Sequence, residues 1–115
     1  MDKLSITGGK RLTGRVTVSG AKNAVLPIIA ASLLAESQCS VLEAPRLADV
    51  HTIIQLIEEL GAKAHWQDTN SLLIDTRSLV EVEPPQEYVR KMRASFLVMG
   101  PLLARKGRAR MWMPG

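Results

Sequence analysis

Residues 19–24, with the sequence SGAKNA, combine a glycine turn with polar side chains at a predicted helix start. Helix N-termini present unpaired N–H groups and the positive end of the helix dipole, and both favour anions. Lys22 adds a full positive charge there, and Asn23 can orient a carbonyl or carboxylate group. The motif lacks the glycines of a P-loop or a dinucleotide fingerprint. Two interpretations stay open, an anion site and an ordinary helix start with a solvated lysine.

The basic stretch of residues 90–95, RKMRAS, is a second candidate at the start of another predicted helix. Arg90 and Arg93 are three residues apart, which places both on one face of a helix. Arginine suits bidentate contacts with phosphate or carboxylate. Positive charge in a first helical turn opposes the dipole, so two arginines there indicate an anionic ligand. A surface charge cluster is the alternative.

Residues 105–110, RKGRAR, form a third basic stretch. It follows a predicted helix, and the dipole favours positive charge at a helix C-terminus. We therefore prefer stabilisation of the helix end and a solvated turn, with a nucleic-acid patch as the alternative. An aromatic content of 3% argues against a module that stacks bases on exposed rings, so we expect no nucleic-acid partner.

The composition fits one modest domain with an aliphatic core, because 46% of the 115 residues are hydrophobic. The net charge of +4 suits phosphate-bearing ligands, although on charge alone a solvated surface with a basic bias is the preferred explanation. The single cysteine, Cys39, offers neither an internal disulfide nor a metal-ligand spacing. No signal peptide is evident, and the longest apolar stretch, residues 24–35, is too short to span a bilayer. We expect a cytoplasmic protein without membrane association.

A buried helix should position the first motif, because residues 21–36 are apolar on most of their helical surface. Proline is tolerated in a first turn, where its missing N–H has no partner. Pro27 therefore limits the start of the helix to about Lys22 or Asn23. A strand over residues 39–44 should follow.

The clearest predicted helix spans residues 49–60, where apolar residues form one stripe at helical spacing. Asp49 is suited to the N-cap and Gly61 to the residue after the C-cap. Two strands, residues 63–67 and 71–75, should follow and be joined by the turn at residues 68–70.

A second long helix is predicted over residues 87–106, where it would position the arginines of the second motif. Gly100-Pro101 lies inside it and should introduce a kink or a tightened turn. A strand over residues 110–113 should follow, with a turn at Pro114-Gly115. Near the start of the chain, alternating apolar residues on either side of a glycine pair predict two short strands, residues 4–6 and 12–18.

An internal repeat is visible when the chain is shifted by 69 residues. The shift places Leu33-Leu34-Ala35 on Leu102-Leu103-Ala104, Lys22 on Lys91, and Pro45 on Pro114. Both copies then contain a buried helix, a short turn, a strand and a proline. The second copy would stop before its amphipathic helix, so we expect the chain to be a fragment.

These motifs, in this order, resemble the UDP-N-acetylglucosamine 1-carboxyvinyltransferases of the enolpyruvyl transferase family. The resemblance runs essentially from end to end, and the related enolpyruvylshikimate phosphate synthases fit these motifs less well. The order and spacing of the motifs carry the resemblance. The matching segments are GAKNA (20–24), LP (26–27), LLAE (33–36), LGAK (60–63), MRAS (92–95), GPL (100–102) and AR (104–105).

The resemblance implies an α/β fold, a truncated part of an inside-out α/β barrel built of repeated βαβαββ units. Each unit would have parallel helices packed against a mixed sheet. Residues 1–20 would form strands that pack with a distant C-terminal domain. Residues 21–115 would form an incomplete N-terminal α/β domain, with one repeat and part of a second.

The resemblance also implies a reaction. Such enzymes transfer the enolpyruvyl group of phosphoenolpyruvate to the 3-hydroxyl of UDP-N-acetylglucosamine, the first committed step of peptidoglycan synthesis, without a metal or organic cofactor. Lys22 matches the lysine that contacts phosphoenolpyruvate, and Asn23 the asparagine beside it. Arg93 matches an arginine at the sugar-nucleotide site. Asp49 matches a position near the cleft, although a capping role is sufficient explanation.

The sequence departs from the family where it stops, at Pro114-Gly115. The family continues here into Pro-Gly-Gly-Cys, on a mobile loop that carries the acid cysteine, and Cys39 is not its equivalent. We therefore expect no catalytic residue within the chain and no activity from these residues alone. The alternatives are a stand-alone anion- or nucleic-acid-binding module, or a structural remnant whose first strands pair with another chain. Exposed strand edges would allow self-association.

Overall fold

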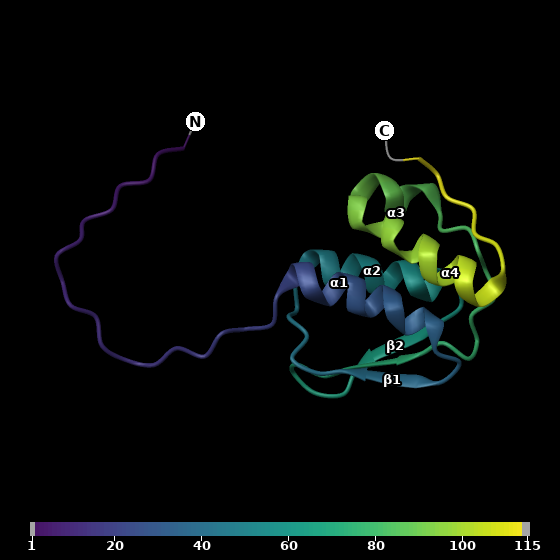
Figure 1. Cartoon of the computed structure of the whole chain (residues 1–115), viewed down its shortest axis with the longest axis horizontal. Coiled ribbons are helices and arrows are strands. Elements are labelled where there is room, and N and C mark those ends of the chain that lie inside the picture. The colour runs from purple at the N-terminus through teal and green to yellow at the C-terminus, as the bar shows by residue number, and fades with distance from the viewer. Residues whose placement is uncertain (1, 114–115) are drawn as a thin grey trace.

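The computed structural model describes residues 2–113, which form helices over one face of a three-stranded sheet, preceded by an extended arm (Figure 1). Helices α1 and α2 lie nearest the strands, with α3 and α4 beyond them. Within this described part, no helix has the length and apolar character needed to cross a bilayer. The elements in chain order are α1 (Lys22–Ala31), η1 (Ser32–Leu34), β1 (Gln38–Val41), α2 (Ala48–Glu59), β2 (Lys63–Trp66), β3 (Leu72–Asp75), α3 (Gln86–Lys91), η2 (Arg93–Val98) and α4 (Met99–Lys106).

The sheet has the order β1-β3-β2, and β3 pairs antiparallel with both neighbours. Ile74 lies opposite Cys39 on one side and Ala64 on the other. Leu72 and Ile74 are fully buried under the helices, whereas Leu73 and Asp75 between and beside them are half-buried. This alternation is the period of two that a half-covered strand requires. The two described pairings are antiparallel, so the mixed sheet expected from the resemblance is not found among them.

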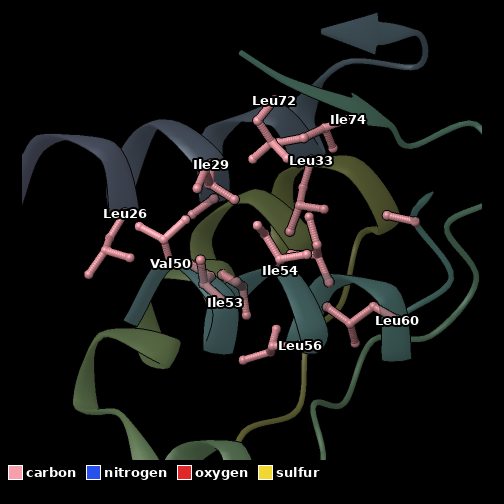
Figure 2. Packing of buried hydrophobic residues seen from close by; sticks show 14 of the residues in the cluster. Leu26, Ile29, Leu33, Val50, Ile53, Ile54, Leu56, Leu60, Leu72 and Ile74 are labelled. Atoms are coloured by element: carbon pink, nitrogen blue, oxygen red, sulfur yellow. The ribbon is translucent and has the colours of Figure 1, made fainter. Parts of the chain in front are cut away.

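The core lies where α1 and α2 meet the sheet and α4 (Figure 2). The apolar stripe of α2 faces inward, as its helical spacing predicts. Each fully buried leucine or isoleucine contributes about 1.5–3 kcal/mol relative to exposure. The large side chains that are fully buried include Ile29, Leu33, Ile53, Leu56, Ile57, Leu60, Leu72, Ile74 and Leu102.

Helix α2 begins one residue earlier than predicted, and its N-cap is Leu47. Asp49 therefore lies in the first turn, where its charge favours the dipole, and the predicted N-cap role is wrong. The C-terminal prediction is confirmed. Gly61 has a φ of 111°, its N–H donates to Glu58, and the next N–H donates to Ile57, which together form a Schellman motif.

Helix α1 begins at Lys22, as predicted, but Pro27 lies in its second turn and not in its first. The carbonyl of Asn23 consequently lacks the N–H that residue 27 would otherwise donate. The helix is also less buried than predicted. Ile28 is 51% exposed and Leu34, in η1, is 52% exposed, because no other described segment covers this face.

The helix predicted over residues 87–106 is divided at Met92, which has extended backbone angles of −146° and 116°. The break lets Tyr88 and Met92 turn into the core from α3 while Val98 and Leu102 reach it from the following segment. Sequence periodicity cannot reveal this break, because it depends on tertiary packing of the side chains on either side of Met92. Pro101 is the third residue of α4, where proline fits without a kink.

The predicted strands at residues 4–6, 12–18 and 110–113 are not found. Residues 2–20 contain no helix or strand, and Leu4 and Ile6 are more than 80% exposed. A strand needs a partner to satisfy its backbone, and the described residues supply none for this arm. Residues 110–113 make one backbone hydrogen bond to another segment, from Arg110 N–H to the Val82 carbonyl (2.9 Å). The predicted turn at Pro114-Gly115 lies outside the described residues.

The internal repeat is visible in the packing. The segments α1–η1 and η2–α4 lie side by side and parallel, because α1 contacts η2 and η1 contacts α4. At the 69-residue shift, Leu33 and Leu102 are both fully buried. Their neighbours Leu34 and Leu103 are 52% and 51% exposed. The two copies therefore present equivalent leucines to the core and to solvent.

Candidate functional site

Lys22 and Asn23 are the first two residues of α1, and both are exposed. The N-cap is Ala21, which has no side chain able to accept a hydrogen bond, and the first turn contains no acid. The N–H groups of this turn are therefore not capped by any side chain of the motif. An uncapped helix start with an adjacent ammonium group is the arrangement that favours an anion.

The ammonium of Lys22 pairs with Asp49, whose Oδ2 lies 3.3 Å from Nζ. Asp49 belongs to the first turn of α2, so the ion pair joins the starts of two neighbouring helices. Both side chains are more than a third exposed, and such pairs contribute only about 0–1 kcal/mol. The pair therefore orients Lys22 more than it stabilises the fold.

Arg93 is the first residue of η2 and is exposed. Arg90 belongs to the last turn of α3, so the extended Met92 separates the two arginines and they do not share a face of one helix. In the last turn of α3, Arg90 and Lys91 favour the dipole. The argument that two arginines oppose a helix dipole is thus wrong, and Arg93 remains a candidate through the resemblance alone.

Lys22, Asn23 and Arg93 are brought toward one another only because the segments that carry them run in the same direction. Because α1–η1 and η2–α4 run parallel, Lys22, Asn23 and Arg93 lie toward the same end of this pair of segments. Across residues 2–113, no hydrogen bond or ion pair joins Arg93 to either of the other two. The structure places them on two separate segments that face a common end of the helical layer.

The arginines of the third basic stretch, residues 105–110, have different environments in the structure. Arg105 is half-buried and donates hydrogen bonds to the carbonyls of Leu33 (3.1 Å), Ala35 (3.0 Å) and Thr76 (2.7 Å). Arg105 and Lys106 lie in the last turn of α4, so the predicted positive charge at this helix end is confirmed. Arg105 also acts as a clamp inside the fold, which was not predicted. Arg110 lies 3.7 Å from a carboxylate oxygen of Glu83. These two arginines have partners within the chain, so the stretch does not form a uniform nucleic-acid patch.

A turn after β1 supports the start of α1, and sequence reasoning missed it. Gly20, which belongs to the predicted glycine turn, lies against the Glu43 carbonyl. Glu43 has a φ of 56°, which is unusual for a residue other than glycine. A small recess of about 70 Å³ opens here, lined by Ser19, Gly20, Glu43, Ala44, Pro45 and Asn70.

The same turn is tied to the β2–β3 connection. Ala44 N–H donates to the Asn70 carbonyl (2.8 Å). Arg46 donates to the carbonyls of Asp68 and Thr69, and its guanidinium lies 4.2 Å from the ring centre of Trp66. The N–H groups of Asn70 and Ser71 hold the pKa of Asp68 below its ordinary value, because they stabilise its carboxylate. The predicted turn at residues 68–70 is confirmed and fixes its neighbours.

Among residues 2–113, no group of three histidine, cysteine or acidic side chains could hold a metal ion. Cys39 lies half-buried on β1, away from the starts of α1 and α2. The chemistry available here is the binding of anions by an ammonium group, an amide and helix N–H groups.

Comparison with known proteins shows the family to which the chain belongs. Residues 6–115 match the family of EPSP synthase (3-phosphoshikimate 1-carboxyvinyltransferase). The chain therefore belongs to this family. Its fold is similar to that of the enolpyruvyl transferase NikO from Streptomyces tendae, with a TM-score of 0.76 and 26% identity over 93% of this chain and 25% of that one.

Two relatives with similar sequences have names that describe one particular reaction within this family. The chain is 50% identical, over its full length, to the UDP-N-acetylglucosamine 1-carboxyvinyltransferase of Dichelobacter nodosus. It is 52% identical to UDP-N-acetylglucosamine 1-carboxyvinyltransferase 2 of Staphylococcus saprophyticus. The chain spans 27% and 28% of these two relatives, that is, about a quarter of their length.

Proposed function

We propose that these residues belong to an enzyme that transfers the enolpyruvyl group of phosphoenolpyruvate to the 3-hydroxyl of UDP-N-acetylglucosamine. The observation that carries the proposal is the identity of about half of all residues with enzymes of that name, along the whole chain. The enzyme would act in the cytoplasm, at the first committed step of peptidoglycan synthesis. It would require no cofactor.

Within this reaction, Lys22 and Asn23 bind phosphoenolpyruvate, and Arg93 binds the sugar nucleotide. Both substrates are anions, so a site that joins them needs positive charge already in place. The ammonium of Lys22 and the uncapped N–H groups of α1 supply it, with the Asn23 amide as a further polar contact. The sugar hydroxyl adds to the phosphate-bearing carbon while a proton is added to the neighbouring methylene carbon. The tetrahedral intermediate then loses phosphate together with a proton from the resulting methyl group, which restores the double bond.

The acid that protonates the enolpyruvyl group is not among these residues. The proposal therefore gives the chain a binding role, with no catalytic residue. It also places residues 1–20 as strands against a later domain, and residues 21–115 as an incomplete N-terminal domain. The exposed apolar side chains of the arm and of α1 are consistent with contacts to further protein.

We test the proposal on the protein as its gene encodes it. With both substrates present it should release inorganic phosphate, and with either substrate omitted it should not. Lys22→Ala should lower kcat/KM for phosphoenolpyruvate by about 100-fold or more, because one preorganised charge is lost. Lys63→Ala is the matched control, since Lys63 is an exposed lysine on β2, and it should leave the rate unchanged. Absence of phosphate release from the unaltered protein would contradict the proposal.

A further inference from the structure

Gly20 is in closer contact with another backbone segment than any side chain would permit. A methyl group at residue 20 would overlap the carbonyl oxygen of Glu43 and lie 3.1 Å from Cδ of Pro45. The φ of Gly20 is outside the left-handed region, so a side chain is excluded by this approach and not by backbone conformation. Glycine is needed here because two backbones meet.

The opposing turn cannot withdraw freely. Ala44 N–H donates to Asn70, and Arg46 donates to Asp68 and Thr69, so the residues that directly follow Glu43 are tied to the β2–β3 connection. Since the sheet holds that connection, a side chain at residue 20 would have to displace the start of α1 instead.

The contact lies directly before the residues assigned to substrate. Ala21 follows Gly20 and accepts the first hydrogen bond of α1, from Val25 N–H (3.0 Å). Lys22 comes next, and its partner Asp49 follows the same turn, in the first turn of α2. The continuous segment of residues 43–49, which comprises the turn after β1 and the start of α2, therefore contacts the backbone before Lys22 and also carries the acid that orients its ammonium group.

We propose that Gly20 is a positioning residue. Its contact with Glu43 fixes the start of α1, and through it the Lys22 ammonium and the Asn23 amide, at the place where the phosphate-bearing substrate binds. This inference rests on the proposed function, because it assumes that Lys22 and Asn23 contact phosphoenolpyruvate.

The test compares two glycines in the protein as its gene encodes it. Gly20→Ala should lower kcat/KM for phosphoenolpyruvate by about 100-fold, because a displacement of about 1 Å at the binding groups has that effect. The loss should fall mainly on the KM for phosphoenolpyruvate. Gly100→Ala is the control, since Gly100 has nothing within 4 Å of the added methyl group, and it should leave kcat/KM unchanged.

A rescue separates the proposed contact from general damage. Glu43→Gly gives that residue the freedom to turn its carbonyl away, so the double variant Gly20→Ala with Glu43→Gly should recover most of the lost kcat/KM. A double variant as impaired as the single one, in folding or in KM, overturns the inference, as does a Gly20→Ala protein with wild-type KM.

A second measurement does not depend on activity. In the protein as its gene encodes it, Gly20→Ala should shift the amide NMR signals of Lys22 and of its ion-pair partner Asp49, which is distant from Gly20 in sequence, and Gly100→Ala should not. If the unaltered protein releases no phosphate but these shifts occur, the proposed function fails and the positioning contact stands. If phosphate is released and neither KM nor the amide signals respond to Gly20→Ala, only the inference fails.

Discussion

The guanidinium group of Arg105 joins three segments that are distant in the chain. It belongs to α4 and donates to carbonyls at the end of η1 and after β3. The Ala35 carbonyl also accepts from the hydroxyl of Thr76, which is fully buried. Hydrogen bonds from a charged group to half-buried carbonyls are stronger than those between neutral groups. At the scale of single residues, this side chain binds the helical layer to the sheet.

Arg105→Ala should lower the free energy of unfolding by about 3 kcal/mol, because carbonyls screened from water would lose a charged donor. Arg105→Lys should recover part of this, since an ammonium group cannot reach all three carbonyls as the planar fork does. Urea unfolding of the chain measures both. The adjacent exposed Lys106→Ala is the control and should change stability by less than about 0.5 kcal/mol. A loss for Arg105→Ala no larger than that of the control would contradict the clamp.

At the scale of elements, the end of α2 is held by more than its glycine. The N–H groups of Val80 and Glu81 donate to the Leu60 carbonyl (3.0 Å each). Ser78 donates its hydroxyl hydrogen to the Gly61 carbonyl (2.6 Å). The loop after β3 therefore closes over the helix end and leaves no room for a side chain at residue 61.

Two glycines with positive φ separate the effect of conformation from that of space. Gly107→Ala, at a φ of 79° with nothing within 4 Å, should cost about 1 kcal/mol of stability. Gly61→Ala should cost more, at least about 2 kcal/mol, because its methyl group would also meet the Ser78 carbonyl oxygen at 2.5 Å. Thermal unfolding of both variants gives the comparison. Equal losses would mean that the loop moves away without resistance.

The elements that could be predicted from sequence are those whose local signals agree with their packing. The apolar stripe of α2, its Gly61 end and the turn between β2 and β3 were predicted correctly within one or two residues. The break at Met92 could not be predicted, because burial of Met92 and Tyr88 decides it and the local pattern is helical on both sides. The strands of residues 2–20 were predicted from alternation alone, which specifies a face but supplies no partner.

The residues of the candidate site also fall into those that local sequence signals predicted and those that they did not. Lys22 and Asn23 were placed correctly at a helix start because the glycine turn directly precedes them, although Pro27 lies in the second turn of α1 and not in the first turn that was assumed. The prediction that Arg90 and Arg93 share a helix face was wrong, because the single helix assumed to carry both is broken at Met92. The contact of Gly20 with Glu43 joins residues 23 positions apart, and no local pattern encodes such a meeting.

At the scale of the whole molecule, the extended arm and the open sheet determine the shape. The radius of gyration is 17.4 Å, whereas a compact chain of this length has one of about 13 Å. The difference reflects residues 2–18, which extend away from the body as an arm (Figure 1). In addition, β1 and β2 each have one unpaired edge, since β3 occupies the position between them.

We expect the chain to associate with itself through these edges, because unpaired strand backbones pair with other strands. The weight-average sedimentation coefficient should therefore rise with protein concentration. Ser40→Lys, on edge strand β1, should reduce the rise, and Thr69→Lys, which makes the same charge change in the exposed turn, should not. A strict monomer at every concentration would rule out this association.

The sheet order also has a consequence for synthesis on the ribosome. Because β3 pairs with both other strands and β1 never pairs with β2, no strand pair can form until residue 75 has emerged. Until then, the nascent chain carries α1, α2 and two unpaired strands whose apolar sides have nothing to rest on. Translation that slowed before β3 would therefore prolong the aggregation-prone stage, and slowing after it would not. Among the described residues, β3 is the strand that joins the other two into one sheet.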